Sequence, residues 1–356
     1  MRFLRAFLRF ILFVGPLSCF AQDHLHAAVS TPLPALDPAQ DLRFAWDSQR
    51  LGCAEDGSLF LSEAHGDGRL APIIAKVATN GTLQWSVDSE RVADLGKTDL
   101  DDFAPGPGGE LFLLVKRVAK EYSSIDEEGH FVQGGHADHP GDWLVRYDSD
   151  GQYLDKKTIP MAHRVRMAVF PSGEMFLLSY TIQGWPFRQG DPPHHTAVLA
   201  GVFSKDGVLI HKVSPPDFFL DKRSGWPRSP SPDPLPMLGR DGNVYVVKEG
   251  DSPAVAVISQ NGSVLRSLAL AIPEGKRLDN SRLFGKHLLA RETNSDAKSD
   301  AATKPLLVEV DTETGQVVSN YLTGKTVWWP GCDQGSGLVA IDPETNTLDL
   351  LEPVSQ

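Results

Sequence analysis

The chain has 356 residues, a formal net charge of −12 and 41% hydrophobic residues. This composition excludes a disordered chain and a polytopic membrane protein. An acidic chain also lacks the basic surface that nucleic-acid binding needs, so no nucleic-acid partner is predicted. The 32 glycines and 26 prolines indicate many turns and few long helices. The length exceeds the size at which one small core stops growing, which favours two domains or one repetitive domain.

Residues 1–21 have the features of a secretory signal peptide. Three arginines within the first nine residues precede a short apolar stretch, and Cys19-Phe20-Ala21 places small residues on either side of a large one, which predicts cleavage after Ala21. The apolar stretch is much shorter than the roughly 20 residues that cross a bilayer, so an uncleaved anchor is disfavoured. A lipoprotein signal through Cys19 is also disfavoured, because Pro16 lies where such signals usually carry leucine.

Cleavage at this point predicts a periplasmic or extracellular protein without a membrane span. It removes three arginines and no acidic residue, so the net charge changes from −12 to −15. Residues 22–40 contain three prolines and show no periodic pattern. They predict a flexible lead-in to a single domain that covers residues 41–356.

Two short patterns alternate along this domain. The first is a glycine turn followed by an apolar strand, as in EDGSLFL (55–61), PGGELFLL (107–114), PSGEMFLL (171–178) and RDGNVYVV (240–247), with weaker copies at 284–290 and 335–341. The second is a strand, a glycine turn and another strand, as in IIAKVATNGTLQW (73–85). Turns of the Asn-Gly and Asp-Gly type between apolar runs are strong hairpin signals, because both central residues tolerate positive φ.

The second pattern recurs with a period close to 55 residues. Its turn glycines are Gly81, Gly151, Gly207, Gly262 and Gly315. About four strands per period is typical of a β-propeller, in which each four-stranded sheet buries both faces against its neighbours. The sequence therefore predicts an all-β fold, a six-bladed β-propeller of four-stranded antiparallel blades. A β-sandwich is the less favoured alternative, since its strands need not recur in this order.

The sixth unit is short, which predicts that an N-terminal strand closes the ring. It contains WWPGCDQ (328–334), GLVAI (337–341) and TLDLL (347–351) as three strands, and LRFAW (42–46) is the expected fourth strand beside 347–351. A competing alignment treats 338–350 as an inner-to-outer hairpin, which changes the strand order of the last blade but not the fold. This arrangement of strands resembles the secreted bacterial six-bladed propellers of the NHL-repeat and TolB-like type. The resemblance lies in generic blade residues and implies no catalytic residue.

Loop lengths predict where a ligand site lies. If the strands of each blade are named A to D from the inside outward, the A–B and C–D turns are short. The long segments 116–142 and 180–195 join B to C, and 212–234 joins D to A. B–C and D–A connections leave the same end of an antiparallel blade. Long loops on a rigid scaffold are the usual place for binding, so we expect the site on this face.

These loops carry side chains suited to an anionic or sugar-like ligand, because arginine offers forked donors and tryptophan a flat apolar face. The expected binding residues are Trp185, Arg188, Arg223 and Trp226, with His136, His139, His194 and His195 nearby. The histidines raise the alternative of a metal, but their spacing matches no zinc signature, so no metal and no cofactor is predicted. Asp99, Asp101 and Asp102 on the same face leave open a calcium site or a carboxylate base.

The sequence contains no catalytic signature, which favours a binding or interaction module whose partner is a protein or a small ligand. A propeller enzyme of the lactonase, lyase or hydrolase kind, using His and Asp side chains on the same face, is the alternative, and whether the protein is an enzyme is left open.

A disulfide is predicted between Cys53 and Cys332. These are the only cysteines after the signal segment, and an exported protein meets an oxidising environment. Both occupy the same position in their unit, and the first and last units of a closed ring are neighbours.

Overall fold

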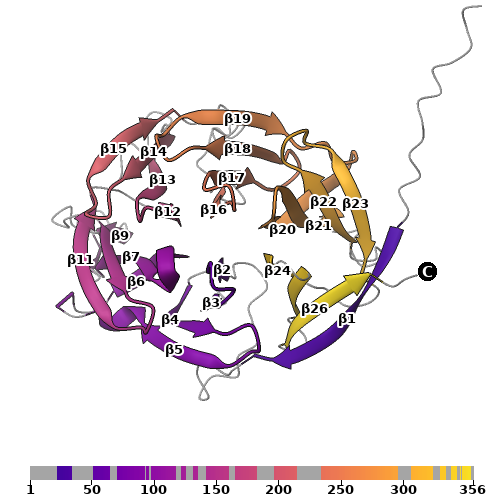
Figure 1. The fold of residues 1–356 in the computed structure, drawn as a ribbon. Coiled ribbons are helices and arrows are strands. Elements are labelled where there is room, and N and C mark those ends of the chain that lie inside the picture. The colour runs from indigo at the N-terminus through magenta and orange to yellow at the C-terminus, as the bar shows by residue number, and fades with distance from the viewer. Residues whose placement is uncertain are drawn as a thin grey trace, which may run out of the picture.

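The computed structural model describes residues 22–33, 51–64, 70–92, 94–95, 98–117, 122–125, 131–134, 142–159, 165–182, 196–214, 234–295, 306–323, 329–333, 338–342, 345 and 347–353. Their strands form six four-stranded antiparallel sheets arranged in a ring, which confirms the predicted six-bladed β-propeller (Figure 1). The first strand of each blade lies nearest the axis, and the last strand lies on the rim.

The first three blades follow the chain from strand A to strand D. Blade 1 consists of β2 (Leu51–Cys53), β3 (Leu59–Ala64), β4 (Leu70–Val77) and β5 (Leu83–Asp88). Blade 2 consists of β6 (Thr98–Pro105), β7 (Leu111–Arg117), β10 (Asp142–Tyr147) and β11 (Tyr153–Ile159), with a separate hairpin of β8 (Tyr122–Ile125) and β9 (Phe131–Gly134) between its B and C strands. Blade 3 consists of β12 (Val165–Val169), β13 (Met175–Ile182), β14 (Thr196–Phe203) and β15 (Leu209–Val213).

The last three blades repeat this order, except that blade 6 takes its D strand from the N-terminal side of the chain. Blade 4 consists of β16 (Leu235–Leu238), β17 (Val244–Lys248), β18 (Ala254–Ile258) and β19 (Val264–Ala269). Blade 5 consists of β20 (Lys276–Phe284), β21 (His287–Asn294), β22 (Leu306–Asp311) and β23 (Val317–Leu322). Blade 6 consists of β24 (Trp329–Asp333), β25 (Leu338–Asp342), β26 (Thr347–Pro353) and β1 (Gln22–Pro32), so the preferred alignment of its A, B and C strands is correct and the competing alignment is wrong.

Two predictions about the N-terminal region are wrong. The strand that pairs with β26 is β1, with Leu25 opposite Pro353 and Pro32 opposite Thr347, so closure does not use 42–46, which lie outside the described residues. Residues 22–33 are therefore part of the ring and not of a flexible lead-in. A rim strand has one edge and much of its surface in water, so the polar sequence of β1 suffices. Among residues 25–33, whose burial is described, only Leu25 and Leu33 are deeply buried.

The C–D turn of each blade lies against the outer strand of the preceding blade. The turn glycines have positive φ, and a Cβ at Gly315 would lie 2.6 Å from the carbonyl oxygen of Ala269 at the end of β19. Likewise a Cβ at Gly81 would lie 2.3 Å from Thr31 Cγ2 at the end of β1. Glycine is thus required both by backbone conformation and by close approach, and the contact at Gly81 places β1 where the other blades have their D strand.

Blade 6 has no C–D turn, because its C and D strands come from opposite parts of the chain. The start of β1 instead pairs in parallel with the end of β23, with Gln22 opposite Asn320 and His24 opposite Leu322. This pairing joins blades 5 and 6 into one eight-stranded sheet.

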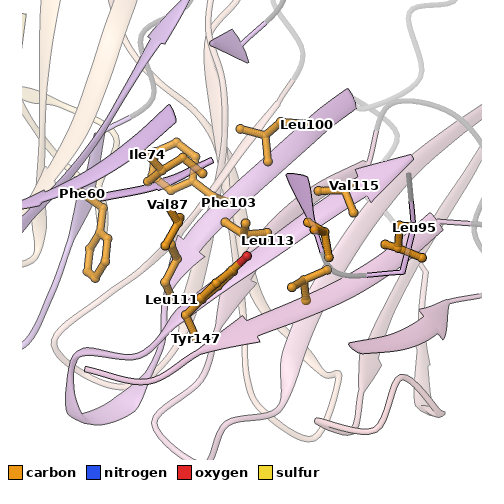
Figure 2. Packing of buried hydrophobic residues seen from close by; sticks show 12 residues of the cluster. Phe60, Ile74, Val87, Leu95, Leu100, Phe103, Leu111, Leu113, Val115 and Tyr147 are labelled. Atoms are coloured by element: carbon orange, nitrogen blue, oxygen red, sulfur yellow. The ribbon is translucent and has the colours of Figure 1, made fainter. Parts of the chain in front are cut away.

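Apolar side chains fill the space between blades. Between blades 1 and 2 the buried cluster includes Phe60 and Ile74 on one side and Leu111, Leu113 and Tyr147 on the other (Figure 2). Similar clusters lie between the other pairs of neighbouring blades, so each blade is buried on both faces. The described helices are two short 3-10 segments, η1 (Ser89–Arg91) and η2 (Pro107–Gly109), and within the described ranges no helix has the length and apolar character that crossing a bilayer requires.

Cys53 of β2 and Cys332 of β24 are joined by a disulfide, with their Cα atoms 5.6 Å apart. The bond links the innermost strands of blades 1 and 6 across 279 residues of sequence. It therefore closes the inner edge of the ring, whereas β1 completes the outer edge.

Candidate functional site

The two ends of the ring differ in the connections that they carry. The A–B and C–D turns lie on one end, which we call the tight-turn face; there, described turns such as 78–82, 148–152 and 259–263 span only five residues. Their geometry repeats, as in the turn where the amide of Gly81 donates to the carbonyl of Ala78. The B–C and D–A connections begin and end on the other end, which we call the insertion face.

The eight predicted binding residues lie outside the described residues. They are His136, His139, Trp185, Arg188, His194, His195, Arg223 and Trp226. The strands that flank their loops are described: β7 and β10, β13 and β14, and β15 and β16 all carry the loop ends on the insertion face of blades 2 to 4. The proximity of the eight side chains to one another stays a prediction.

The described part of the insertion face brings together charged residues from blades 5 and 6. Alternation along the strands places Arg277, Asp279, Arg282 and Arg291 on the same side of blade 5 as Leu289, which packs against Ala340 of blade 6. By the same alternation Asp342 and Asp349 lie on the side of blade 6 that faces blade 5. We call these six residues the blade 5–6 charged cluster.

One forked pair and two single hydrogen bonds hold carboxylates of this cluster. Arg291 Nε donates to Asp279 Oδ1 at 2.7 Å and its Nη2 to Oδ2 at 2.8 Å, across neighbouring strands. Asp342 Oδ1 accepts from the amide of Thr345, and Asp349 Oδ1 accepts from the hydroxyl of Thr347. Three arginines and three aspartates leave the cluster with no net charge, so it is suited to join blades and hold polar groups in place.

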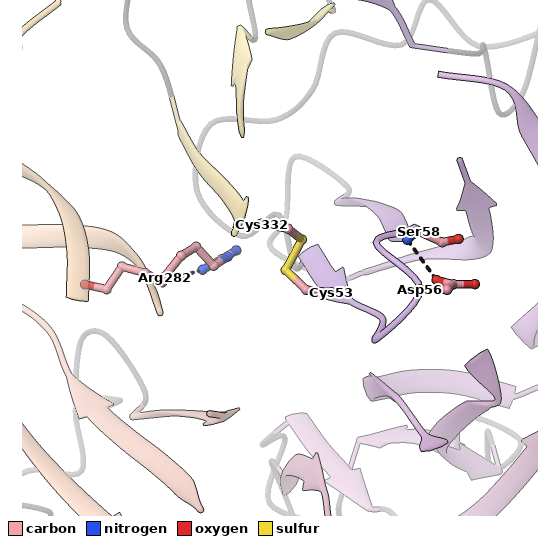
Figure 3. Close-up of a disulfide and its surroundings, with 6 residues drawn as sticks. Cys53, Asp56, Ser58, Arg282 and Cys332 are labelled. Carbon is pink, nitrogen blue, oxygen red and sulfur yellow. Dashed lines mark hydrogen bonds between the residues drawn. A yellow bond between two sulfur atoms is a disulfide. The ribbon is translucent and has the colours of Figure 1, made fainter. Parts of the chain in front are cut away.

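Arg282 lies between blade 5 and the strand that carries Cys332 (Figure 3). Its Nη1 donates to the carbonyl of Ser281 at 2.7 Å, and the amide of Ser281 donates to Glu249 Oε1 at 2.5 Å. Burial lowers the pKa of Arg282, and the negative charge of Glu249 opposes that effect. Burial raises the pKa of Glu249, while the amide of Ser281 and the charge of Arg282 lower it. The two charges thus compensate each other at the inner edge of the ring.

A second polar contact joins blades 2 and 3. Asp102 is fully buried and accepts from its neighbour's amide, that of Phe103, at 2.8 Å and from the amide of Met167 in β12 at 2.7 Å. Asp101 pairs with Lys116, and its carbonyl accepts from Arg166 Nη1 at 3.1 Å. Both aspartates therefore take part in hydrogen bonds that join β6 of blade 2 to β12 of blade 3. Among the described residues no group of three or more His, Cys, Asp or Glu side chains is placed to hold a metal ion.

Sequence reasoning missed Arg166, Glu249 and Arg291 as residues of this face, and Arg282, which lies in β20 nearer the A–B turn. A usable signal was present in KRLDNSR (276–282), where four charged residues interrupt an inner strand, whereas the inner strands of blades 1 and 4, LGC and LPML, contain none. Charges in an inner strand need partners, which come from the adjacent strand, as for Asp279, or from a neighbouring blade.

Arg291→Gln is expected to lower the free energy of unfolding by about 2–3 kcal/mol, because it leaves Asp279 without its forked donor. Both side chains are about one-fifth exposed, 20% for Arg291 and 19% for Asp279, so the loss falls below that of a fully buried pair. The matched control is Arg91→Gln, whose side chain is 86% exposed beside Asp88 and whose loss should stay under about 0.5 kcal/mol. Urea unfolding measures both, and equal effects would contradict the role given to the cluster.

No protein-family model and no curated protein matches the chain. Among solved structures, a protein of unknown function from Dyadobacter fermentans DSM 18053 is similar with a TM-score of 0.52 and 10% identity, over 92% of this chain and 99% of that one. A protein of unknown function from Bacteroides caccae has a TM-score of 0.45 and 11% identity over 78% and 81% of the two chains. A TolB-like protein from Agrobacterium tumefaciens has a TM-score of 0.41 and 10% identity over 86% and 90%. At such identities the likeness concerns the fold alone, and the resemblance to NHL-repeat proteins stays a prediction.

Proposed function

We propose that the protein is an exported binding module, periplasmic or extracellular, whose main ligand site lies on the insertion face. The observation that carries this proposal is the asymmetry of the two faces. The described turns of the tight-turn face are short and repetitive, whereas connections such as those between β13 and β14 and between β15 and β16 are long and differ from blade to blade. A rigid ring with variable loops on one face is suited to binding.

The ligand class follows from the side chains of the loops over blades 2 to 4. Arg188 and Arg223 would hold negative charge by paired hydrogen bonds, and Trp185 and Trp226 would stack on an apolar or sugar face. A local basic region of this kind governs contact even in a protein of net negative charge, since overall charge mainly affects approach. The proposed partners are therefore a small anionic or sugar-like ligand, or a protein that presents such groups.

This proposal is tested by immobilising the mature protein and measuring which members of a set of neutral and anionic oligosaccharides it retains. Sugars retained by the wild type should be lost with the double variant Arg223→Ala/Trp226→Ala, while its melting temperature should change by only a few degrees. The control is Lys205→Ala/Gln260→Ala on the tight-turn face, where both residues are exposed. Retention that survives in the first variant and disappears in the control would contradict the proposed face. Failure to retain any sugar would contradict the sugar-like ligand.

A further inference from the structure

A cavity of about 450 Å³ opens between blades 4 and 5 on the tight-turn face. Arg240 and Arg266 from blade 4 and Lys286 and Glu313 from blade 5 line it, together with Tyr245 and Val257. Its volume falls within the range of small-molecule sites. It lies at the opposite end of the ring from the loops of the proposed function.

The inner part of the cavity is apolar. Tyr245 and Val257 are both almost fully buried and belong to the cluster that packs blade 4 against blade 5. Burial is the main cause that raises the pKa of Tyr245, so its phenol is neutral at neutral pH and does not repel an anion. The accessible apolar side chain of the cavity is Leu265, which is 58% exposed and on which an apolar group can pack.

Neither carboxylate that lines this cavity forms an ion pair with Arg266 within the described part of the chain. Asp241 already accepts hydrogen bonds from Asn243 and from the hydroxyl of Tyr245, which donates to Oδ2 at 3.0 Å. Glu313 is 3.9 Å from Lys286, and the two side chains are 54% and 62% exposed, so water screens this pair.

The repeat provides an internal comparison for Arg266. We compare the residue that stands two positions before the C–D turn, on strand C, and the residue opposite it on strand D. In blades 1, 2 and 4 one residue of this pair is a cation. Lys76 of blade 1 lies 3.3 Å from Asp56, and Arg146 of blade 2 donates to Asp155 through Nε at 2.8 Å. In blade 4 this pair is Val257 and Arg266.

Arg266 has no ion pair within the described part of the chain, and its Nε is buried with no hydrogen-bond partner there. A buried donor without an acceptor is costly, so an oxygen ligand that accepts from it gains the corresponding free energy. Guanidinium groups hold carboxylates through two parallel hydrogen bonds.

We propose that the cavity between blades 4 and 5 binds a small carboxylic acid with an apolar body. The carboxylate accepts from Arg266 and lies near Lys286, and the apolar body packs on Leu265. Arg240, which belongs to the A–B turn of blade 4, also lines the cavity.

Calorimetric titration of the mature protein with benzoate tests this inference, with benzamide as a neutral probe of the same shape and inorganic phosphate as an anion without an apolar body. Benzoate should bind saturably, and both other probes should bind at least tenfold more weakly. Equal binding of benzamide would show that the cations are not used. Tighter binding of phosphate would exclude the apolar body, and the absence of saturable benzoate binding would overturn the proposal.

Point variants test whether benzoate binds in the cavity between blades 4 and 5. Arg266→Met should weaken benzoate binding at least tenfold, whereas Lys205→Met, an exposed cation on the same face in blade 3, should leave it unchanged. Glu313→Gln should strengthen binding two- to threefold, because it removes a competing carboxylate beside Lys286. This gain cannot result from partial unfolding. Unchanged affinity in both Arg266→Met and Glu313→Gln would refute the site.

Discussion

A protein whose closing strand has been removed, with residues 22–33 deleted after the signal segment, is expected to lose more than about 5 kcal/mol of unfolding free energy. The deletion takes away two buried leucines, Leu25 and Leu33, each of which contributes about 2–5 kcal/mol in comparable core positions. It also leaves the whole length of β26 as an open sheet edge, which promotes association between chains. Thermal unfolding and size-exclusion chromatography measure both effects.

Two point variants test whether the ring loses stability because β1 no longer packs against blade 5, and not because the chain is shorter. Leu25→Asp puts a charge into the apolar cluster between blades 5 and 6 and should destabilise by several kcal/mol. Val29→Asp in the same strand, at a side chain that is 55% exposed, should change stability by less than about 0.5 kcal/mol. A deletion protein that stays monomeric with an unchanged melting temperature would show that β1 does not close the ring.

The double variant Cys53→Ala/Cys332→Ala is expected to lose about 3–5 kcal/mol. The disulfide closes a loop of 279 residues, and chain-entropy models give close to 5 kcal/mol for loops of this length, although measured gains are often 2–4 kcal/mol. Cys332 is buried, so removal of its sulfur adds a small loss of packing. Denaturant unfolding of the oxidised wild type and the variant measures the difference.

Thiol titration supplies the control for this prediction. The unfolded, unreduced mature protein should show no free thiol, and reduction of the wild type should reproduce the stability of the variant. Two free thiols before reduction, or a variant as stable as the oxidised wild type, would contradict the role of the bridge.

The blade architecture was readable from the sequence because its signals are local. Turns such as Asn80-Gly81 and Asp206-Gly207 need positive φ at a fixed position, and the apolar runs on either side need a partner strand close in sequence. Each hairpin is therefore specified within about a dozen residues. Repetition of the hairpins at a regular spacing then indicates a ring, since no blade buries its faces alone.

The identity of the closing strand was not readable in the same way. LRFAW is more apolar than the sequence of β1 and looked like the better strand, but a rim strand buries few side chains, so hydrophobicity does not identify it. The pairing of β1 with both β26 and β23 joins residues that are some 300 positions apart in the chain, and no local pattern reports such contacts.

The sequence by itself thus determined the fold class, the number of blades, the difference between the two faces and the cysteine pair to consider. Only the tertiary structure decided that β1 closes the ring, that Arg291 meets Asp279 inside the blade 5–6 charged cluster, and that Arg266 faces a cavity while Arg146 at the corresponding level is paired. The physical reason is that turns and strands follow from neighbours in sequence, whereas the partner of a charge depends on strand register and on which side chains the packed blades bring beside it.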